Sequence, residues 1–190
     1  VKQFDISLGG VVNGEWMNFG SFPSKLDSWQ ILSAYKNDAS VGSAVINQLI
    51  HDKYRSSEIY KINNIKRRNT LRPLGTDAIV YGDKVINIQN QPRNKYKMED
   101  AWLYYERLDK SEKTPIPSEP TFYVANGEIG IVEGFFNKPS RHLIRFNSQP
   151  LYNYSWKSKV ADEGDCDLEL AYALTVHKAQ GSEFNKVILV

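Results

Sequence analysis

The sequence predicts an α/β domain that is interrupted by a small all-β unit. A short apolar run followed by a helical pattern lies in the first third of the chain, and α/β character returns in the last stretch. Between them apolar residues recur at every second position, which is typical of strands. We assign residues 1–76 and 164–190 to the α/β domain and residues 77–163 to the inserted β unit with its helical linker. A chain of 190 residues can bury a core of this kind.

The first α/β part contains a strand, a loop and a helix in succession. Residues 29–35 are a short apolar run between polar residues and predict a buried strand. Residues 41–54 carry apolar side chains at helical spacing and predict an amphipathic helix. Upstream, Asn13-Gly14 predicts a small hairpin in residues 11–16. Downstream, the basic residues 56–73 predict a loop.

The inserted unit begins with residues 84–88, whose alternation predicts a strand with one exposed face. Residues 98–113 predict a short helix, and the three prolines that follow predict an extended linker. Three later segments have period two and are separated by turn sequences, so they predict a small antiparallel barrel or meander. These segments are residues 121–124, 129–136 and 142–146.

The last stretch follows an acidic loop at residues 162–167. Residues 171–176 and 186–190 predict two buried strands, and residues 177–184 predict the turn between them. The chain stops inside the second apolar run. We therefore expect this sequence to be a piece of a longer protein.

The charge distribution allows a nucleic-acid partner but does not require one. The formal net charge is only +2, yet residues 55–97 hold ten Lys or Arg against three Asp or Glu, and residues 98–119 hold three against six. Such a separation fits either an electrostatic footprint for nucleic acid or an unevenly charged surface. The basic run Lys66-Arg67-Arg68 is one candidate contact, and a solvated loop is the alternative.

The composition excludes several classes of protein. Cys166 is the only cysteine, so the chain cannot form an internal disulfide or a cysteine zinc site. Nor does the sequence contain an apolar stretch long enough to cross a membrane or the pattern of a signal peptide. We expect no membrane partner and a cytoplasmic location. No carboxylate cluster indicates a metal site, so we expect no metal ligands in this piece.

The segment Leu170-Ala171-Tyr172-Ala173-Leu174-Thr175-Val176-His177-Lys178-Ala179-Gln180-Gly181-Ser182-Glu183-Phe184 closely resembles motif V of superfamily 1 helicases. Its Thr-Val-His-Lys-x-Gln-Gly-Ser-Glu form is similar to the RecD-like branch, the exonuclease V alpha-subunit type. Residues 30–49 resemble the strand and helix around motif IV, and residues 81–86 with 125–132 resemble the small SH3-like domain inserted in that branch. The resemblance covers residues 29–190 and leaves residues 1–28 unplaced.

This resemblance implies an incomplete RecA-like domain of the P-loop NTPase type, interrupted by an SH3-like barrel. The whole protein would then be an ATP-dependent DNA helicase that couples ATP hydrolysis to movement along single-stranded DNA. ATP and Mg²⁺ would be its cofactors, and the other partner of this piece would be an N-terminal RecA-like domain of the same protein. A non-enzymatic nucleic-acid-binding module with a RecA-like remnant is the main alternative, and a protein-docking scaffold is a third.

The resemblance also assigns candidate binding residues. Gly181 lets the backbone approach a phosphate, and Glu183 resembles the glutamate that accepts a hydrogen bond from the ATP ribose. The predicted nucleotide-binding residues are Gln180, Gly181, Ser182, Glu183 and Lys36. The predicted DNA-binding residues are Thr175, His177 and Lys178, together with the basic side chains Arg141 and Arg145 of the insert, which lie near aromatic residues as in many small barrels that bind single strands.

The sequence also departs from the helicase pattern. It contains no Gly-x-x-x-x-Gly-Lys-Ser/Thr loop and no apolar strand ending in Asp-Glu, so the phosphate-cradling lysine and the Mg²⁺ ligands are not in this piece. The arginine-bearing motif VI should lie beyond Val190. We therefore expect that this piece alone does not hydrolyse ATP.

Overall fold

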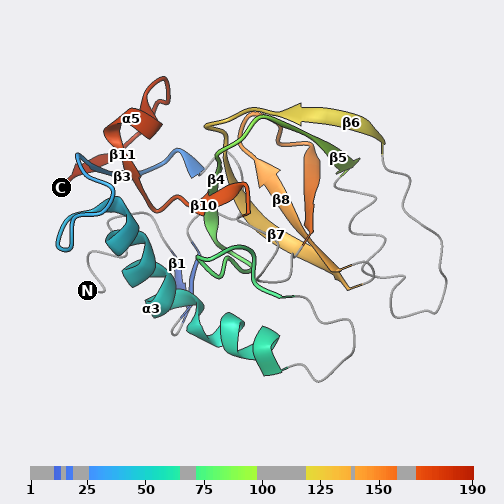
Figure 1. Cartoon of the computed structure of the whole chain (residues 1–190), viewed down its shortest axis with the longest axis horizontal. Helices are drawn as coiled ribbons and strands as arrows, with labels where there is room; N and C mark the ends of the chain where they lie inside the picture. The colour runs from blue at the N-terminus through green and yellow to red at the C-terminus, as the bar shows by residue number, and fades with distance from the viewer. Residues whose placement is uncertain are drawn as a thin grey trace.

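The computed structural model describes residues 11–13, 16–18, 26–64, 72–97, 119–137, 140–157 and 166–190, and of the strand segments 11–13, 16–18, 119–121, 135–137 and 140 it describes the backbone alone. The described part is a mixed α/β structure in which strands predominate (Figure 1). Its strands form a two-stranded, a seven-stranded and a three-stranded sheet. The predicted α/β class is confirmed at this level.

The three-stranded sheet is parallel and is assembled from distant parts of the chain. Its central strand β3 (Gln30–Ser33) pairs with β11 (Ala173–Thr175) on one side and with β12 (Val187–Leu189) on the other. Helix α3 (Ser43–Asn64) follows β3, and the single-turn helix α5 (Val176–Ala179) follows β11. The predicted strand, helix and C-terminal pair of strands are therefore present.

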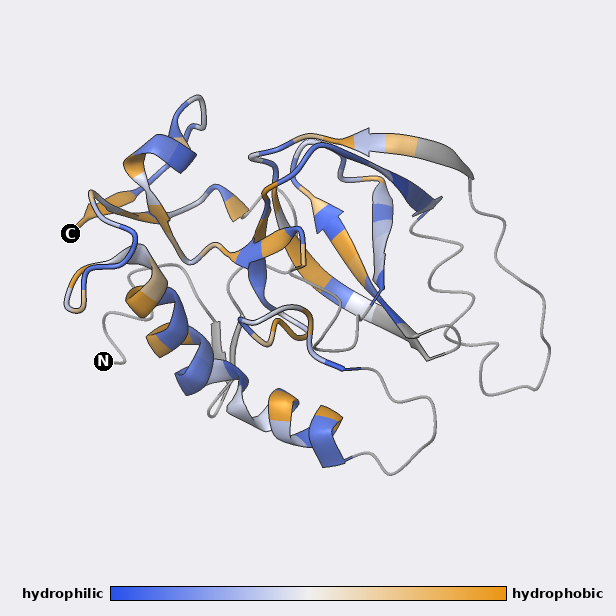
Figure 2. Cartoon of the chain, viewed as in Figure 1, coloured by the Kyte–Doolittle hydropathy of each residue, from blue (hydrophilic) through white to orange (hydrophobic). Residues whose placement is uncertain are grey.

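Helix α3 is longer than predicted. It continues through residues 56–64, where the basic composition predicts a loop. The second half is helical because it also has a buried side: Ile62 packs with Val80 and with the partly buried Ile59. Figure 2 shows hydrophobic residues in both halves of the helix. The predicted DNA contact Lys66-Arg67-Arg68 lies outside the described residues.

Strand β12 is less buried than predicted. Val187 and Leu189 are exposed and only Ile188 packs partly against the core. The reason is its position, since β12 lies at the edge of the parallel sheet and, among the described strands, pairs with β3 alone.

The seven-stranded sheet is antiparallel throughout, in the order β10-β4-β7-β8-β9-β5-β6. Its strands are β4 (Lys84–Asn87), β5 (Gln91–Lys97), β6 (Glu119–Val124), β7 (Ile129–Asn137), β8 (Ser140–Phe146), β9 (Tyr152–Lys157) and β10 (Leu168–Leu170). Four of them, β4, β6, β7 and β8, correspond to the predicted strands. Strands β5, β9 and β10 were not predicted. The predicted helix at residues 98–113 and its linker lie outside the described residues, except that β6 begins at Glu119.

The sheet curls so that its two ends approach each other. Arg93 on β5 forms an ion pair with Asp167, which directly precedes β10. The side-chain amide of Asn87, at the end of β4, likewise reaches the end of β6. It donates to the backbone oxygens of Val124, at 3.2 Å, and Ala125, at 2.8 Å. Inside the curl, the Phe146 ring contacts the rings of Tyr154 and Trp156. Figure 1 shows the strands of this sheet curving around one side of the molecule, from β10 and β4 through β7 and β8 to β5 and β6.

Strand β4 is buried on both faces, whereas its alternation predicts one exposed face. All four of its residues are buried. It lies between β10 and β7 in the sheet, and the Lys84 ammonium reaches into the segment before β3. Tertiary packing has therefore covered the face that the polar residues predict to be exposed.

Two further points complete the fold. The predicted N-terminal hairpin is present as β1 (Val11–Asn13) and β2 (Trp16–Asn18), which pair antiparallel on either side of Gly14. None of the described helices has the length and apolarity that crossing a membrane requires.

Candidate functional site

A pocket lies where two of the parallel strands end. Thr175, the last residue of β11, is paired with Ser33, the last residue of β3. Open parallel sheets bind ligands outside the carboxyl ends of their strands. Here a cavity of about 220 Å³ is lined by Lys36, Thr175 and Lys178, by the start of α3, and by Asp77 and Glu169 from the neighbouring segments. The structure thus brings together three predicted binding residues from the two ends of the chain.

The loop that carries Lys36 is held by its own hydrogen bonds. The Asp38 carboxylate accepts from the backbone N–H groups of Ser40, at 2.8 Å, and Val41, at 3.0 Å. The Ser33 hydroxyl donates to the Val41 carbonyl at 2.6 Å. Gly42 ends the loop, and a Cβ there would lie 2.4 Å from the Asp38 carbonyl oxygen, which leaves room for glycine alone. Lys36 therefore emerges from a defined turn beside the start of α3.

Thr175 begins helix α5 and so determines where the following residues point. Its hydroxyl oxygen accepts from the Lys178 N–H at 3.3 Å, which is the N-cap arrangement. The turn ends at Gln180, whose N–H donates to the His177 carbonyl at 3.3 Å, and Gly181 then adopts a positive φ of 85°. This single turn directs Lys178 into the pocket. It leaves His177 and Gln180 exposed on the other side.

A carboxylate joins the two lysines of the pocket. One oxygen of Glu169 lies 2.6 Å from the Lys178 ammonium and the other lies 3.2 Å from the Lys36 ammonium. Partial burial acts to raise the pKa of Glu169, but the hydrogen bonds and charges of the two lysines outweigh it and hold the pKa below its ordinary value. The trio therefore carries one net positive charge at neutral pH. Glu169 was not among the predicted site residues.

Asn47 is a second residue that the prediction missed. Its side-chain amide donates to the carbonyl oxygens of Leu170 and Ala173, at 2.9 Å each, and its side-chain oxygen accepts from the Ala173 N–H at 2.7 Å. Asn47 thus clamps the chain that enters β11 onto helix α3. A signal exists in the sequence, because Asn47 shares the apolar side of the predicted helix with Ile50 and Tyr54.

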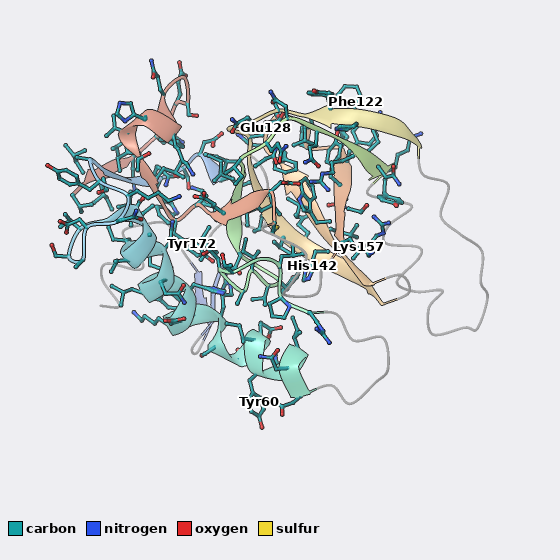
Figure 3. All side chains as sticks on the ribbon, viewed as in Figure 1. Tyr60, Phe122, Glu128, His142, Lys157 and Tyr172 are labelled. Atoms are coloured by element: carbon teal, nitrogen blue, oxygen red, sulfur yellow. The ribbon has the colours of Figure 1, made fainter. Side chains whose placement is uncertain are left out.

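A buried polar cluster lies behind the pocket. The Tyr172 hydroxyl donates to Asp83 at 2.6 Å, and the Val80 N–H donates to the other carboxylate oxygen at 2.7 Å. Arg55 and His51 of α3 approach the same carboxylate at 3.3 Å and 3.7 Å. Figure 3 shows Tyr172 between α3 and the seven-stranded sheet. The cluster therefore joins the two sheets and the helix directly beneath β11.

Lys84 forms a second buried connection. Its ammonium donates to the carbonyl oxygens of Leu26, at 2.7 Å, and Trp29, at 3.0 Å, and to the Gln30 side-chain oxygen at 3.0 Å. Gln30 in turn donates to the Ala171 and Tyr172 carbonyls at 3.1 Å and 3.0 Å. Burial lowers the pKa of Lys84 to about 7, and the Asp27 carboxylate acts in the opposite direction.

The predicted nucleotide-binding residues lie mostly on the other side of α5. Gln180, Gly181 and Ser182 line a second, more open cavity of about 370 Å³ together with apolar side chains such as Phe184. His177, which was predicted to bind DNA, lines this cavity and not the pocket of Lys178. Glu183 is exposed in the same turn. Lys36 is separate from this group and lies with Thr175 and Lys178 instead. The predicted residues therefore lie on two faces of the turn. Thr175 and Lys178 line the first pocket, and His177, Gln180, Gly181 and Ser182 line the second.

Arg141 and Arg145 lie apart from both cavities, on strand β8. Arg145 is 5% exposed and forms an ion pair with Glu133 on the neighbouring strand. Arg141 is half-buried, donates to the Ser155 hydroxyl at 3.3 Å, and is paired across the strands with Lys157. Lys157 is exposed at the end of β9 (Figure 3). The structure does not bring these two arginines to the site that holds Lys178.

The donor set of the described residues limits what the site could hold. The two cavities present ammonium, hydroxyl, amide and backbone N–H groups, which suit phosphate and sugar oxygens. In the part of the chain that the structure describes, no group of three or more His, Cys, Asp or Glu side chains is arranged to hold a metal ion.

Comparison with known proteins provides one distant relative. No protein-family model matches this chain. The chain is similar to an uncharacterized protein of Methanocaldococcus jannaschii, with 28% identity over 183 residues. The similarity covers 93% of this chain but 13% of the archaeal protein, so the chain spans a small part of the length of that relative. Because its description gives no activity, the function must be argued from the site.

Proposed function

We propose that this chain is a motor-domain piece of an ATP-dependent DNA helicase of superfamily 1, similar to the RecD-like branch. Its own part in that activity is to hold the phosphates of a single strand at the pocket of Lys36, Thr175 and Lys178. The observation that carries the proposal is this convergence: Lys36 from the motif IV-like segment lies beside Thr175 and Lys178 of the motif V-like segment, at the carboxyl ends of paired parallel strands.

The architecture supports assigning the chain to a second RecA-like domain with an SH3-like insert. Three parallel strands with α3 packed beside β11 are what an incomplete RecA-like sheet requires. The curled antiparallel sheet is formed by strands that lie between α3 and β11 in the chain, as an insert would be. The seam between the two sheets is a set of buried hydrogen bonds around Asp83 and Lys84, so the insert is fixed to the α/β part rather than tethered to it.

The chemistry of the pocket suits a nucleic-acid backbone. Two ammonium groups, a hydroxyl and the start of a 22-residue helix without acidic residues in its first turn make the pocket rich in donors, while the carboxylates of Glu169 and Asp77 in its lining offset the charge of the lysines. Contacts of this kind bind phosphates without reading bases. A translocating motor needs such sequence-independent affinity, because every step presents a new sequence to the same residues.

ATP would bind at the other face of the turn. Gln180, Gly181, Ser182 and Glu183 are exposed there, and this donor and acceptor set fits the phosphate and ribose oxygens of one side of a nucleotide. When bound, ATP would supply the free energy for movement along the strand. The residues of this chain would orient the nucleotide, and a partner RecA-like domain would have to supply the remaining contacts and the Mg²⁺ ligands.

Binding of a fluorescein-labelled oligo(dT) strand, measured by fluorescence anisotropy over a series of salt concentrations, tests the proposal. We expect the affinity to fall linearly on a log–log plot with salt, because phosphate contacts release counterions. Lys178→Gln should lower the affinity about fivefold and reduce the salt slope by roughly 0.7, the value for one phosphate contact on a single strand. Lys61→Gln removes the same charge from the exposed end of α3, where Lys61 pairs with Glu58, and should change the affinity less than about twofold.

Two results would contradict the assignment. Absence of strand binding by the wild-type chain at low salt would remove its basis. If Lys178→Gln and Lys61→Gln lowered the affinity equally, the loss would reflect the overall charge of the protein, and the pocket would not be the binding site.

A non-enzymatic nucleic-acid-binding module with a RecA-like remnant is the second candidate. The pocket supports this candidate too, because its residues suit the phosphates of a strand without any ATP site. Both candidates predict strand binding, so the ATPase activity of the full-length protein decides between them. A motor shows ATP hydrolysis that single-stranded DNA stimulates, and a binding module shows none.

A further inference from the structure

Glu169 is placed where a bound phosphate would be expected. Its two oxygens contact one lysine each, Lys178 at 2.6 Å and Lys36 at 3.2 Å. A backbone phosphate bridging the same two ammonium groups would present two oxygens in a similar way. The carboxylate therefore neutralises part of the positive charge that the strand would use.

The backbone of Glu169 is held in place. It lies in the middle of β10, opposite Ile86 of β4, and its neighbours Leu168 and Leu170 are both buried. The carboxylate can leave the lysines by rotation of its side chain, but strand β10 cannot move away without exposing this core. Glu169 consequently remains close to the lysines whether or not a ligand is present.

The lysines are nevertheless accessible from solvent. The Lys36 side chain is 52% exposed, and the Lys178 and Glu169 side chains are 32% and 30% exposed. The ion pairs thus line an open cavity and are not sealed in the core. An anion can approach the ammonium groups while the carboxylate still contacts them from the protein side.

We infer that Glu169 is an intramolecular competitor of the strand, whose carboxylate occupies Lys36 and Lys178 and thereby weakens their hold on a backbone phosphate of single-stranded DNA. The inference rests on the proposed strand-binding function. A motor must release each phosphate as it advances, and a permanent carboxylate beside the two lysines lowers the affinity at this one contact. The alternative role is a structural link between β10 and the parallel sheet.

The two roles predict opposite effects of Glu169→Gln on strand binding. A competitor, once neutralised, leaves both lysines available, so the Kd for labelled oligo(dT) should fall about five- to tenfold at low salt. The salt slope should also become steeper, by up to about 0.7. A structural link predicts unchanged or weaker binding, because the lysines lose the group that positions them. Circular dichroism melting establishes that each variant is folded.

Three controls test the contact directly. Glu58→Gln removes the same charge from the exposed pair with Lys61, far along α3. Asp52→Asn removes a negative charge from an exposed residue of α3 that accepts from the Gln48 side-chain amide at 2.6 Å and does not line the pocket. Each should change the Kd less than about twofold. In a Lys36→Gln/Lys178→Gln background, Glu169→Gln should give no gain at all. A gain of equal size in either control, or one that persists without the lysines, overturns the inference.

Glu169→Thr provides a second variant, because a β-branched residue is compatible with the strand. It should tighten binding as Glu169→Gln does, and folded variants that bind no more tightly than wild type refute the competitor role. Binding of a fluorescent ADP analogue separates the two sources of phosphate. A gain for the nucleotide without a gain for the strand would show that the strand is not the ligand. If the wild-type chain binds the strand normally and Glu169→Gln does not improve it, only this inference fails; if neither binds, the proposed function fails.

Discussion

The seven-stranded sheet and the three-stranded sheet use basic side chains in different ways. In the seven-stranded sheet, Arg93 and Arg145 are mostly buried in ion pairs with Asp167 and Glu133. At the end of the three-stranded sheet, Lys36 and Lys178 surround an open pocket and share one carboxylate. Burial makes the difference, because Arg145 is 5% exposed whereas the Lys178 side chain is 32% exposed. Basic residues in the large sheet therefore stabilise it, and those at the parallel strands are available for binding.

The seam between these two sheets is the set of buried hydrogen bonds around Asp83 and Lys84. Asp83 and Lys84 belong to the segment that enters the large sheet, yet their partners lie on α3, on β3 and on the chain that enters β11. Because these groups are buried, each must be satisfied within the protein. The three-stranded sheet is thus attached to the seven-stranded one by residues that contact α3, β3 and the chain that enters β11.

The largest effect is expected when the seam is broken at Asp83. Asp83→Asn removes the carboxylate beside the fully buried guanidinium of Arg55 and should lower the free energy of unfolding by about 3–5 kcal/mol, the usual cost of removing one partner of a buried pair. Urea denaturation measures the change. Lys61→Ala in the exposed pair with Glu58 provides the comparison and should cost less than about 1 kcal/mol. Similar losses in the free energy of unfolding of both variants would show that the seam stabilises the protein no more than an exposed ion pair does.

A smaller, pH-dependent effect is expected from Lys84. Its pKa is about 7 in the folded protein and about 10.4 in an unfolded chain, so above pH 7 the unfolded chain binds more protons. The free energy of unfolding should then rise with pH, by up to about 1.4 kcal/mol per unit. The range from pH 7 to about 8 is suitable because it lies below the ordinary pKa values of cysteine and tyrosine, about 8.5 and 10.

Comparison of variants isolates the contribution of Lys84. Lys84→Met should flatten the rise relative to wild type, whatever its effect on absolute stability. Lys157→Met, at an exposed residue of β9, should retain the wild-type slope. Identical slopes in wild type and Lys84→Met would contradict the depressed pKa.

The smallest effect is expected on strand binding by Arg145→Gln, and it sharpens the contrast between the sheets. Arg145 is 5% exposed and is paired with Glu133, so its replacement should cost about 1–2 kcal/mol of stability and change the Kd for oligo(dT) less than about twofold. Lys178→Gln should weaken the binding of oligo(dT) about fivefold and have little effect on the free energy of unfolding. A loss of strand affinity in a folded Arg145→Gln protein would place a strand contact on the large sheet.

Much of the fold follows from local pattern. Strand β3, helix α3 and strands β6, β7 and β8 have clear apolar spacing, and the Asn13-Gly14 turn identifies the hairpin β1–β2. The missed strands are those whose pattern is concealed. Strand β5 contains one buried aromatic residue, Tyr96, among polar residues and a proline, and β9 buries Asn153 and Ser155 beside its aromatic residues. Their strand conformation depends on neighbours in the sheet, which local spacing does not reveal.

Part of the candidate site could also be predicted. The motif from Thr175 to Glu183 identifies the turn, because its residue types are suited to phosphate and sugar groups. Asn47 has a signal in the apolar stripe of its helix. Glu169 has almost none, since a single carboxylate between two leucines is typical of any half-exposed strand.

The sequence by itself determined the alternation of strand and helix, the β-rich middle part of the chain and the motif at the turn, because each depends on residues close together in the chain. Only the tertiary structure decided which charges meet. Lys36, Glu169 and Lys178 come from a loop, a strand of the seven-stranded sheet and a helical turn, and their distances depend on how β10 and β11 pack against β3 and α3. The same packing buried Arg145 and left Lys178 open, so it, and not residue type, distinguishes a structural cation from one available to a ligand.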